Sequence, residues 1–138
     1  MKSHKLLLLV MVAVFALFAC KKTEEESARF KLLTGNVWTS DSLLVDGEDA
    51  SYPGGFLEDF AGDAEFKKDG TGYFGQYTGT WFFSNNEQDI TISSPSLAFP
   101  LTARIVELND TSFKITTNFP TAVEGVYMVI RITFKKKE

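Results

Sequence analysis

The sequence predicts an all-β fold, a small antiparallel barrel of eight strands. Three observations support this prediction. Segments rich in β-branched and aromatic residues alternate apolar with polar side chains, as strands with one buried face do. Asp-Gly and Asn-Asn pairs, which tolerate positive φ, separate these segments at short intervals. Aromatic residues make up 14% of the chain, and closure into a barrel would protect the edges of such aromatic strands from pairing with other chains.

The elements follow in order along the chain. A short helical turn is expected over 27–33, ended by Gly35, with Phe30 and Leu33 on one side. In the last strand Ile130 and Ile132 share one face, and Arg131 lies on the other, because side chains alternate along a strand. The eight strands are predicted at 37–45, 64–68, 73–77, 80–84, 89–93, 101–108, 112–117 and 126–136.

Residues 46–62 form the one long segment in which we predict no strand. Loops of this length in a compact domain are often functional lids. Within it, Phe56, Leu57 and Phe60 have helical spacing, which predicts a single turn folded over one end of the barrel. This cluster either plugs that end or covers a pocket there.

The N-terminus has the pattern of an export signal. Lys2 and Lys5 accompany an unbroken apolar run over 6–18, which is shorter than the roughly 20 residues a membrane-spanning helix needs. The run ends in Leu-Phe-Ala-Cys, which resembles the lipobox of bacterial lipoproteins, and Cys20 is the chain's single cysteine. We therefore expect a lipoprotein signal peptide over 1–19, cleavage before Cys20 and a lipid on that cysteine. An ordinary signal peptide is the alternative.

The mature chain is expected to contain one domain. Residues 20–29 are predicted to hold the lipidated cysteine and an acidic flexible tether, and residues 30–138 the barrel. The run Glu24-Glu25-Glu26 is either a surface-export signal or a solubilising spacer. These features place the protein in the cell envelope, anchored to the outer membrane through lipid on Cys20, on its periplasmic or its outer face.

Charge and composition exclude several function classes. The mature chain keeps twelve basic against eighteen acidic side chains, a net charge of about −6, which argues against nucleic-acid binding. The only histidine, His4, leaves with the signal, so no His-dependent nucleophile and no usual zinc, copper or haem ligand set remains. We expect no enzyme activity, no cofactor and no metal. A group of carboxylates lies in and near the loop over 46–62, and we expect these side chains to be solvated; weak calcium binding and catalysis are the alternatives. They are Glu48, Asp49, Glu58, Asp59, Asp63 and Glu65. The basic run Lys135, Lys136 and Lys137 is expected to be a solvated strand end.

Several short motifs, in order, resemble bacterial lipocalin-like domains of the calycin type. They are Leu32-Leu33-Thr34-Gly35-Asn36-Val37-Trp38, Phe66-Lys67-Lys68-Asp69-Gly70-Thr71, Gly79-Thr80-Trp81 and Leu108-Asn109-Asp110-Thr111-Ser112-Phe113. The resemblance implies a lipocalin-like barrel in which Trp38 packs across the closed end beneath a basic residue of the last strand, for which Arg131 is the candidate. A guanidinium over an indole gains about 0.5–2 kcal/mol. The chain has Gly-x-x-Trp where lipocalins have Gly-x-Trp.

The resemblance implies a non-enzymatic protein that binds a small hydrophobic ligand. The candidate ligand-binding residues are Phe56, Phe60, Phe66, Trp81, Phe83, Phe113 and Met128. An eight-stranded barrel is either just filled by its side chains or holds one small ligand; a filled interior is the default, and a pocket beneath the loop over 46–62 is the alternative. If the barrel is solid, the function is instead that of an interaction module contacting protein or glycan in the cell envelope.

Overall fold

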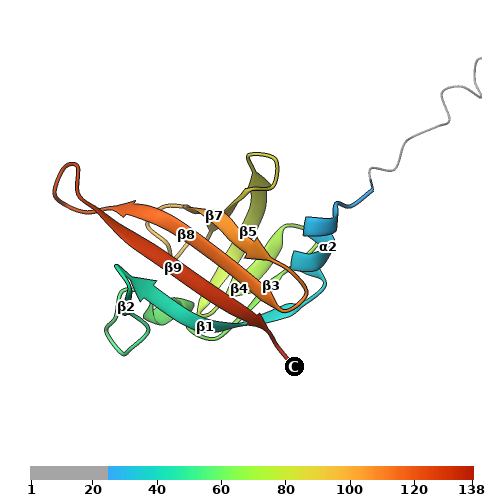
Figure 1. Cartoon of the computed structure of the whole chain (residues 1–138), viewed down its shortest axis with the longest axis horizontal. Helices are drawn as coiled ribbons and strands as arrows, with labels where there is room; N and C mark the ends of the chain where they lie inside the picture. Colours follow the sequence, from blue (N-terminus) through green and yellow to red (C-terminus); the bar gives the residue numbers. More distant parts are fainter. Residues whose placement is uncertain (1–24) are drawn as a thin grey trace, which may run out of the picture.

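A computed structural model of the protein describes residues 25–138. Eight strands form a closed, fully antiparallel barrel in which each strand pairs with the next along the chain and β9 returns to pair with β1 (Figure 1). The all-β barrel prediction is therefore confirmed. The barrel strands are β1 (Val37–Val45), β3 (Asp63–Phe66), β4 (Thr71–Phe74), β5 (Tyr77–Ser84), β6 (Asp89–Ser93), β7 (Leu101–Leu108), β8 (Ser112–Pro120) and β9 (Tyr127–Lys136).

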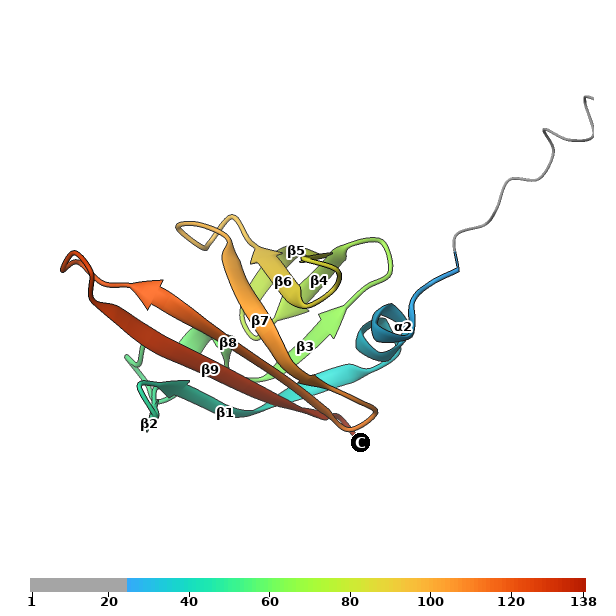
Figure 2. The ribbon, with the colours of Figure 1, turned by 45° about the horizontal axis from the view of Figure 1, so that its top comes forward.

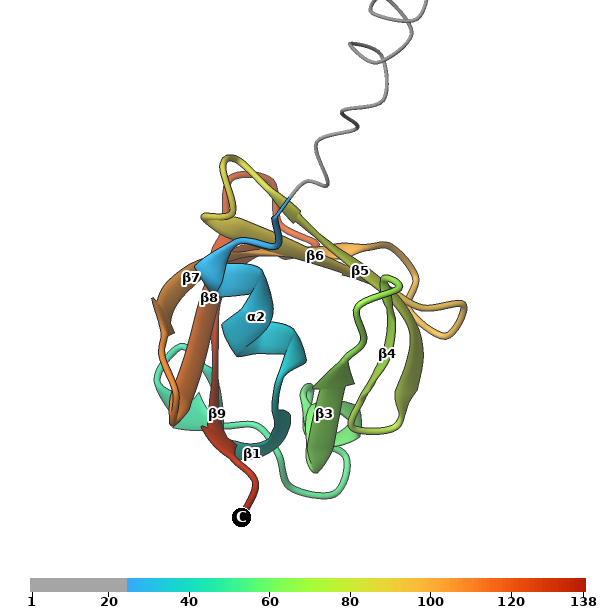
Figure 3. The ribbon, with the colours of Figure 1, turned by 90° about the vertical axis from the view of Figure 1, so that its right-hand side faces the viewer.

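A seven-residue helix, α2 (Ala28–Thr34), covers one end of the barrel, as a view from that end shows (Figure 3). The Ser27 side chain accepts a hydrogen bond from the Phe30 amide and caps the helix, and the Gly35 amide donates to Lys31 at its end. A helix this short is marginal alone, so packing must hold it. Leu33 is fully buried, which confirms the predicted turn.

The folded domain begins earlier than the predicted boundary at residue 30. The Ser27 hydroxyl donates to the Glu87 carboxylate at 2.6 Å, and Arg29 Nε donates to the Glu87 carbonyl at 2.9 Å. These contacts tie the start of α2 to the turn between β5 and β6. Residues 28 and 29, expected in the tether, are helical.

Two bulges allow the sheet to curve into a barrel. The register of β1 against β9 shifts between Ser40 and Ser42, and that of β7 against β8 between Ile105 and Glu107. An extra residue in one strand bends it and increases its twist. The first bulge also changes which face the strand buries, since Trp38 is buried before it and Leu43 after it.

A cluster of buried aromatic side chains fills the end of the barrel covered by α2. Five large side chains there are between 0 and 2% exposed. Phe113 lies at its centre, with its ring centroid 5.5 Å from those of Phe66 and Phe134 and 5.8 Å from that of Trp38. Such aromatic pairs add stability beyond their buried area, so this end is a packed core. The five side chains are Trp38, Phe66, Phe74, Phe113 and Phe134.

Three predicted elements need correction. The strand expected over 73–77 is broken, because Gly75 has φ 63° and turns the chain between β4 and β5. β8 continues three residues past the predicted end at 117. The segment over 46–62 is not free of strand: β2 (Glu48–Asp49) pairs with the end of β1, and the 3₁₀ turn η1 (Glu58–Phe60) follows.

The long β8–β9 hairpin projects at the end of the barrel opposite α2 (Figure 2). That end, called the mouth below, is surrounded by the loops over 46–62, 94–100 and 121–126 and by the Gly75–Gln76 turn. In the described part of the chain no helix is long and apolar enough to cross a membrane.

Candidate functional site

An apolar pocket of about 380 Å³ lies at the mouth. This volume is within the range of small-molecule sites, which are concave and mostly apolar. Its lining combines two loops with residues of four strands, β5, β7, β8 and β9, so residues far apart in sequence meet there. None of the eleven lining residues is charged: Phe56, Leu57, Phe60, Tyr77, Ser96, Leu97, Ala98, Phe99, Leu101, Phe119 and Ile130.

Three aromatic rings from three separate segments form the outer wall. Phe119 lies near the end of β8. Its ring centroid is 5.4 Å from that of Phe56, with the two ring planes inclined at 69°. It is 5.3 Å from the ring centroid of Phe99, with the planes inclined at 24°. Phe56 and Phe99 belong to the loops on either side. The exposed fractions of Phe56 and Phe99 are 53% and 51%. Large apolar side chains held at a pocket edge with this exposure present a contact surface to a ligand.

A second aromatic pair forms the inner wall. The Phe60 and Tyr77 rings lie 4.7 Å apart, inclined at 52°. Burial, followed by the nearby Asp59 carboxylate, raises the pKa of the Tyr77 phenol. The phenol therefore stays protonated at neutral pH, with its hydroxyl toward Asp59. Tyr77 and Ser96 supply the only polar side chains of the lining.

Backbone hydrogen bonds fix the loop that carries Phe56 and Phe60. The Ala50 amide donates to the Leu43 carbonyl of β1 at 2.8 Å, and the Leu57 amide donates to the Ala50 carbonyl at 3.0 Å. On the other side, the Gln76 amide donates to the Asp59 carbonyl at 2.8 Å. The Leu57 side chain is 1% exposed. This part of the loop is therefore a fixed wall of the pocket and plugs the barrel beneath it.

Further exposed apolar side chains surround the mouth. Six of the eight large hydrophobic residues exposed in the described chain lie on the mouth loops or beside them. Scattered exposed hydrophobics are ordinary, whereas a group at one place marks an interaction surface. We call this group the apolar rim: Tyr52, Phe56, Phe99, Val123, Val126 and Tyr127.

The structure brings together only two of the seven candidate ligand-binding residues. Phe56 and Phe60 line the pocket. Phe66, Trp81 and Phe113 belong instead to the packed core near α2, where Trp81 Nε1 donates to the Lys67 carbonyl at 3.0 Å. Phe83 packs edge-on against Trp81, and Met128 pairs with Phe119 across β8 and β9 without lining the pocket.

Three pocket residues were missed for identifiable reasons. Leu97 and Phe99 lie in a proline-bounded segment that the sequence assigns to a loop, where alternation gives no direction to a side chain. Phe119 lies beyond the predicted end of its strand at 117. One feature of the sequence does indicate the role of this loop. The segment over 97–101 is entirely apolar, whereas a loop exposed to solvent is usually polar, so its side chains could have been expected to pack against a pocket.

The pairing of Trp38 with Arg131 is wrong. Arg131 is exposed on the outer face of β9 and lies opposite Leu44, whereas the partner of Trp38 is Lys136. Trp38 is nonetheless fully buried at the closed end. Its indole N–H donates to the Leu33 carbonyl at 3.1 Å. The helix α2 thus covers the tryptophan where the resemblance implied an arginine.

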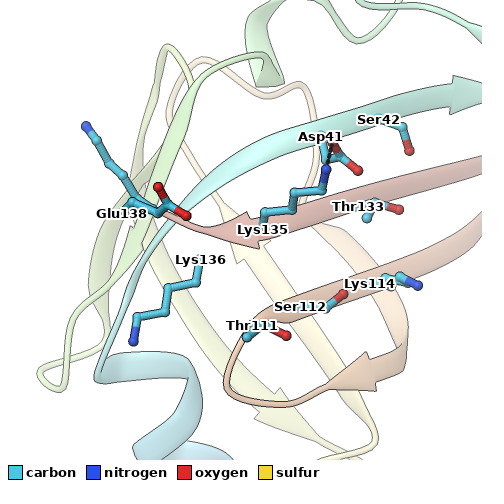
Figure 4. A pocket seen from close by; sticks show the side chains of 10 residues that line it. Asp41, Ser42, Thr111, Ser112, Lys114, Thr133, Lys135, Lys136 and Glu138 are labelled. Atoms are coloured by element: carbon cyan, nitrogen blue, oxygen red, sulfur yellow. Dashed lines mark ion pairs between the residues drawn. The ribbon is translucent and has the colours of Figure 1, made fainter.

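A larger hollow of about 790 Å³ lies on the outer face of β1, β8 and β9 (Figure 4). Polar and charged side chains line it, and three of its four lysines have carboxylate partners: Lys135 contacts Asp41 at 2.8 Å, Lys114 contacts Glu107 at 3.3 Å, and Lys137 pairs with Asp63. Exposed pairs of this kind contribute little energy. The hollow is an open, solvated strand surface, and the smaller apolar pocket is the better candidate for a ligand.

The acidic side chains near the loop over 46–62 make local contacts. Asp49 accepts hydrogen bonds from the Ser51 amide and hydroxyl, which lower the pKa of its carboxyl. Glu58 accepts from the Gly54 amide at 2.7 Å. Asp63 pairs with Lys137 and accepts from Thr39. Within residues 25–138, no group of three His, Cys, Asp or Glu side chains is placed to hold a metal ion.

The signal peptide over 1–19, Cys20 and the start of the tether lie outside the described residues. What the structure defines is a class of architecture, a closed eight-stranded antiparallel barrel with one end packed and an apolar pocket at the other. Protein-family models and curated protein sequences give no match to this chain.

Proposed function

We propose that this protein is a non-enzymatic, lipid-anchored, lipocalin-like protein that encloses a small hydrophobic molecule in its mouth pocket. The observation that carries the proposal is the pocket itself, with five aromatic rings and no charged group in its lining. Burying such a ligand removes apolar area from water, which contributes roughly 25 cal/mol per Å². The ordered motifs described above and the helix-covered closed end also support kinship with lipocalin-like domains.

The anchor in this proposal rests on the sequence. The apolar run over 6–18 and the Leu-Phe-Ala-Cys end of that run support lipidation at Cys20. The absence of histidine after residue 4 and of cysteine after residue 20 supports binding in place of nucleophilic catalysis.

Native mass spectrometry of the protein purified from its host membrane tests the proposal directly. We expect a bound small molecule that leaves on denaturation. Phe119→Ala removes the ring between Phe56 and Phe99 and should weaken retention about tenfold, as a loss of roughly 1.4 kcal/mol does. Phe82→Ala, which removes an exposed phenylalanine of β5 away from the mouth, is the matched control.

The proposal fails if the wild-type protein carries no small molecule and does not bind a neutral apolar fluorescent probe such as N-phenyl-1-naphthylamine. It also fails if the probe binds wild type and Phe119→Ala with equal affinity, because the mouth pocket is then not the site.

The apolar rim favours a second candidate, an interaction module that contacts a partner protein at the mouth. Tyr127 and Val123 belong to the rim but not to the pocket lining, with exposed fractions of 60% and 63%. Tyr127→Ser with Val123→Ser should abolish partner capture while leaving probe binding intact. If capture survives in this variant, the rim is not a protein-binding surface.

A further inference from the structure

The loops around the mouth carry charge of one sign. Segments 46–62, 94–100 and 121–126 together contain six carboxylates and no lysine or arginine. None of the six takes part in an ion pair within the described chain, whose salt bridges involve other acidic residues. These mouth carboxylates are Asp46, Glu48, Asp49, Glu58, Asp59 and Glu124.

Hydrogen bonds hold several of these groups in place as acceptors. The Asp46 carboxylate accepts from the Val129 amide at 2.8 Å, and Glu58 accepts from the Gly54 amide at 2.7 Å. Asp59 lies between Glu58 and the pocket residue Phe60, with the Tyr77 hydroxyl beside it. Glu58 and Asp59 therefore hold negative charge directly between the pocket residues Leu57 and Phe60.

The pocket lining offers nothing to balance an anion. Its only polar side chains are the hydroxyls of Ser96 and Tyr77. The nearest basic residue by strand register, Arg131, lies on the outer face opposite Leu44. The aromatic wall also favours cations, because the face of an aromatic ring carries partial negative charge. A buried carboxylate or phosphate would lack a partner here, which is costly.

We infer that the mouth selects its ligand by charge, accepting an apolar body with a positive or neutral polar end and rejecting anions such as fatty acids. This inference rests on the proposed ligand-binding function. At about 8 Å in water, each carboxylate changes the binding constant of a unit charge by roughly a factor of two. Because a cation gains this factor and an anion loses it, two such carboxylates give a preference on the order of tenfold for the cation at low salt, and salt screens it.

Three probes that share one naphthalene body isolate the charge: 2-naphthylmethylamine, 2-naphthylmethanol and 2-naphthoate. Titration calorimetry on residues 21–138, which include the whole described barrel and its core, gives their dissociation constants. In 20 mM salt the amine should bind about tenfold more tightly than the naphthoate, with the alcohol between them. In 500 mM salt the ratio should fall several-fold.

Variants locate the effect. Asp59→Asn with Glu124→Gln should reduce the amine-to-naphthoate ratio several-fold without weakening the alcohol. Asp110→Asn with Glu107→Gln, which removes one carboxylate from the β7–β8 turn beside α2 and one from the end of β7, should leave the ratio unchanged.

The outcomes separate the two proposals. If none of the probes binds, the ligand-binding function itself fails. If all three bind with equal affinity, or the naphthoate binds most tightly, the charge inference fails and the binding function stands. A ratio that the mouth variants leave unchanged also overturns the inference, because the charge preference then comes from elsewhere.

Discussion

A methyl group at position 75 would collide with the segment that forms the inner wall of the pocket. Gly75 turns the chain between β4 and β5 with φ 63°, and an alanine Cβ there would lie 2.3 Å from the Asp59 carbonyl oxygen and 2.7 Å from the Phe60 carbonyl carbon. Both are backbone atoms and cannot rotate away. The Gly75→Ala substitution must therefore push η1 outward by about 1 Å, given the usual contact distances near 3.5 Å.

The cost has two parts. A non-glycine residue in the left-handed region costs about 1–2 kcal/mol. Displacing η1 also weakens the hydrogen bond from the Gln76 amide to the Asp59 carbonyl, which contributes about 1 kcal/mol, and loosens the packing of Phe60 on Tyr77. The total is a loss of about 2–4 kcal/mol in the free energy of unfolding. Gly47→Ala is the matched control, because Gly47 has φ 85° with nothing within 4 Å of the added Cβ, and should lose about 1–2 kcal/mol from strain alone.

Urea unfolding followed by tryptophan fluorescence measures both losses. The reporters Trp38 and Trp81 are 0% and 4% exposed and lie toward the other end of the barrel, so the signal follows global unfolding. The affinity for a neutral apolar probe should fall in Gly75→Ala and stay unchanged in Gly47→Ala. Equal losses of stability in the two variants would refute the reasoning, because the close approach to η1 would then contribute nothing.

Two further predictions rest on the structure and a third on the sequence alone. Trp38→Ala should lower the free energy of unfolding by about 3–5 kcal/mol, against less than about 1 kcal/mol for Phe82→Ala on the exposed face; similar losses in urea unfolding would contradict the packed end. Lys137, followed by Thr39, lowers the pKa of Asp63. Ionised Asp63 therefore stabilises the fold above its ordinary pKa of about 3.9, and this contribution is lost as the pH falls through the lowered value. In the Asp63→Asn variant the free energy of unfolding should therefore depend less on pH below about 4 than in wild type. If the free energies of unfolding of variant and wild type change with pH in parallel, the contact between Asp63 and Lys137 does not contribute to stability. Cys20→Ser should leave an unlipidated precursor, and palmitate labelling as strong as in wild type would show that the lipid is elsewhere.

Most of the strands and most of their turns could be predicted from the sequence, because these depend on neighbours along the chain. Asp46 and Gly47 adopt φ of 51° and 85°, and Asn85 and Asn86 adopt 51° and 54°, as their preference for positive φ predicts. Alternation correctly gave the buried face of the last strand, including Ile130 and Ile132. The helical spacing of Phe56, Leu57 and Phe60, also a local pattern, correctly predicted a single turn within 46–62, which the structure shows as η1.

Which inward side chains meet could not be predicted from the sequence, because it depends on contacts between distant segments. Alternation indicates which face of a strand Phe66 and Phe113 lie on, but not how far each lies along the barrel axis. That depth depends on strand register, on the shifts at the two bulges and on the pairing of β1 with β9, all of which involve residues distant in sequence. For this reason Phe66 and Phe113 fill the closed end, and Arg131 lies far from Trp38. The pocket arises where two loops and four strands converge, and no local pattern records that convergence.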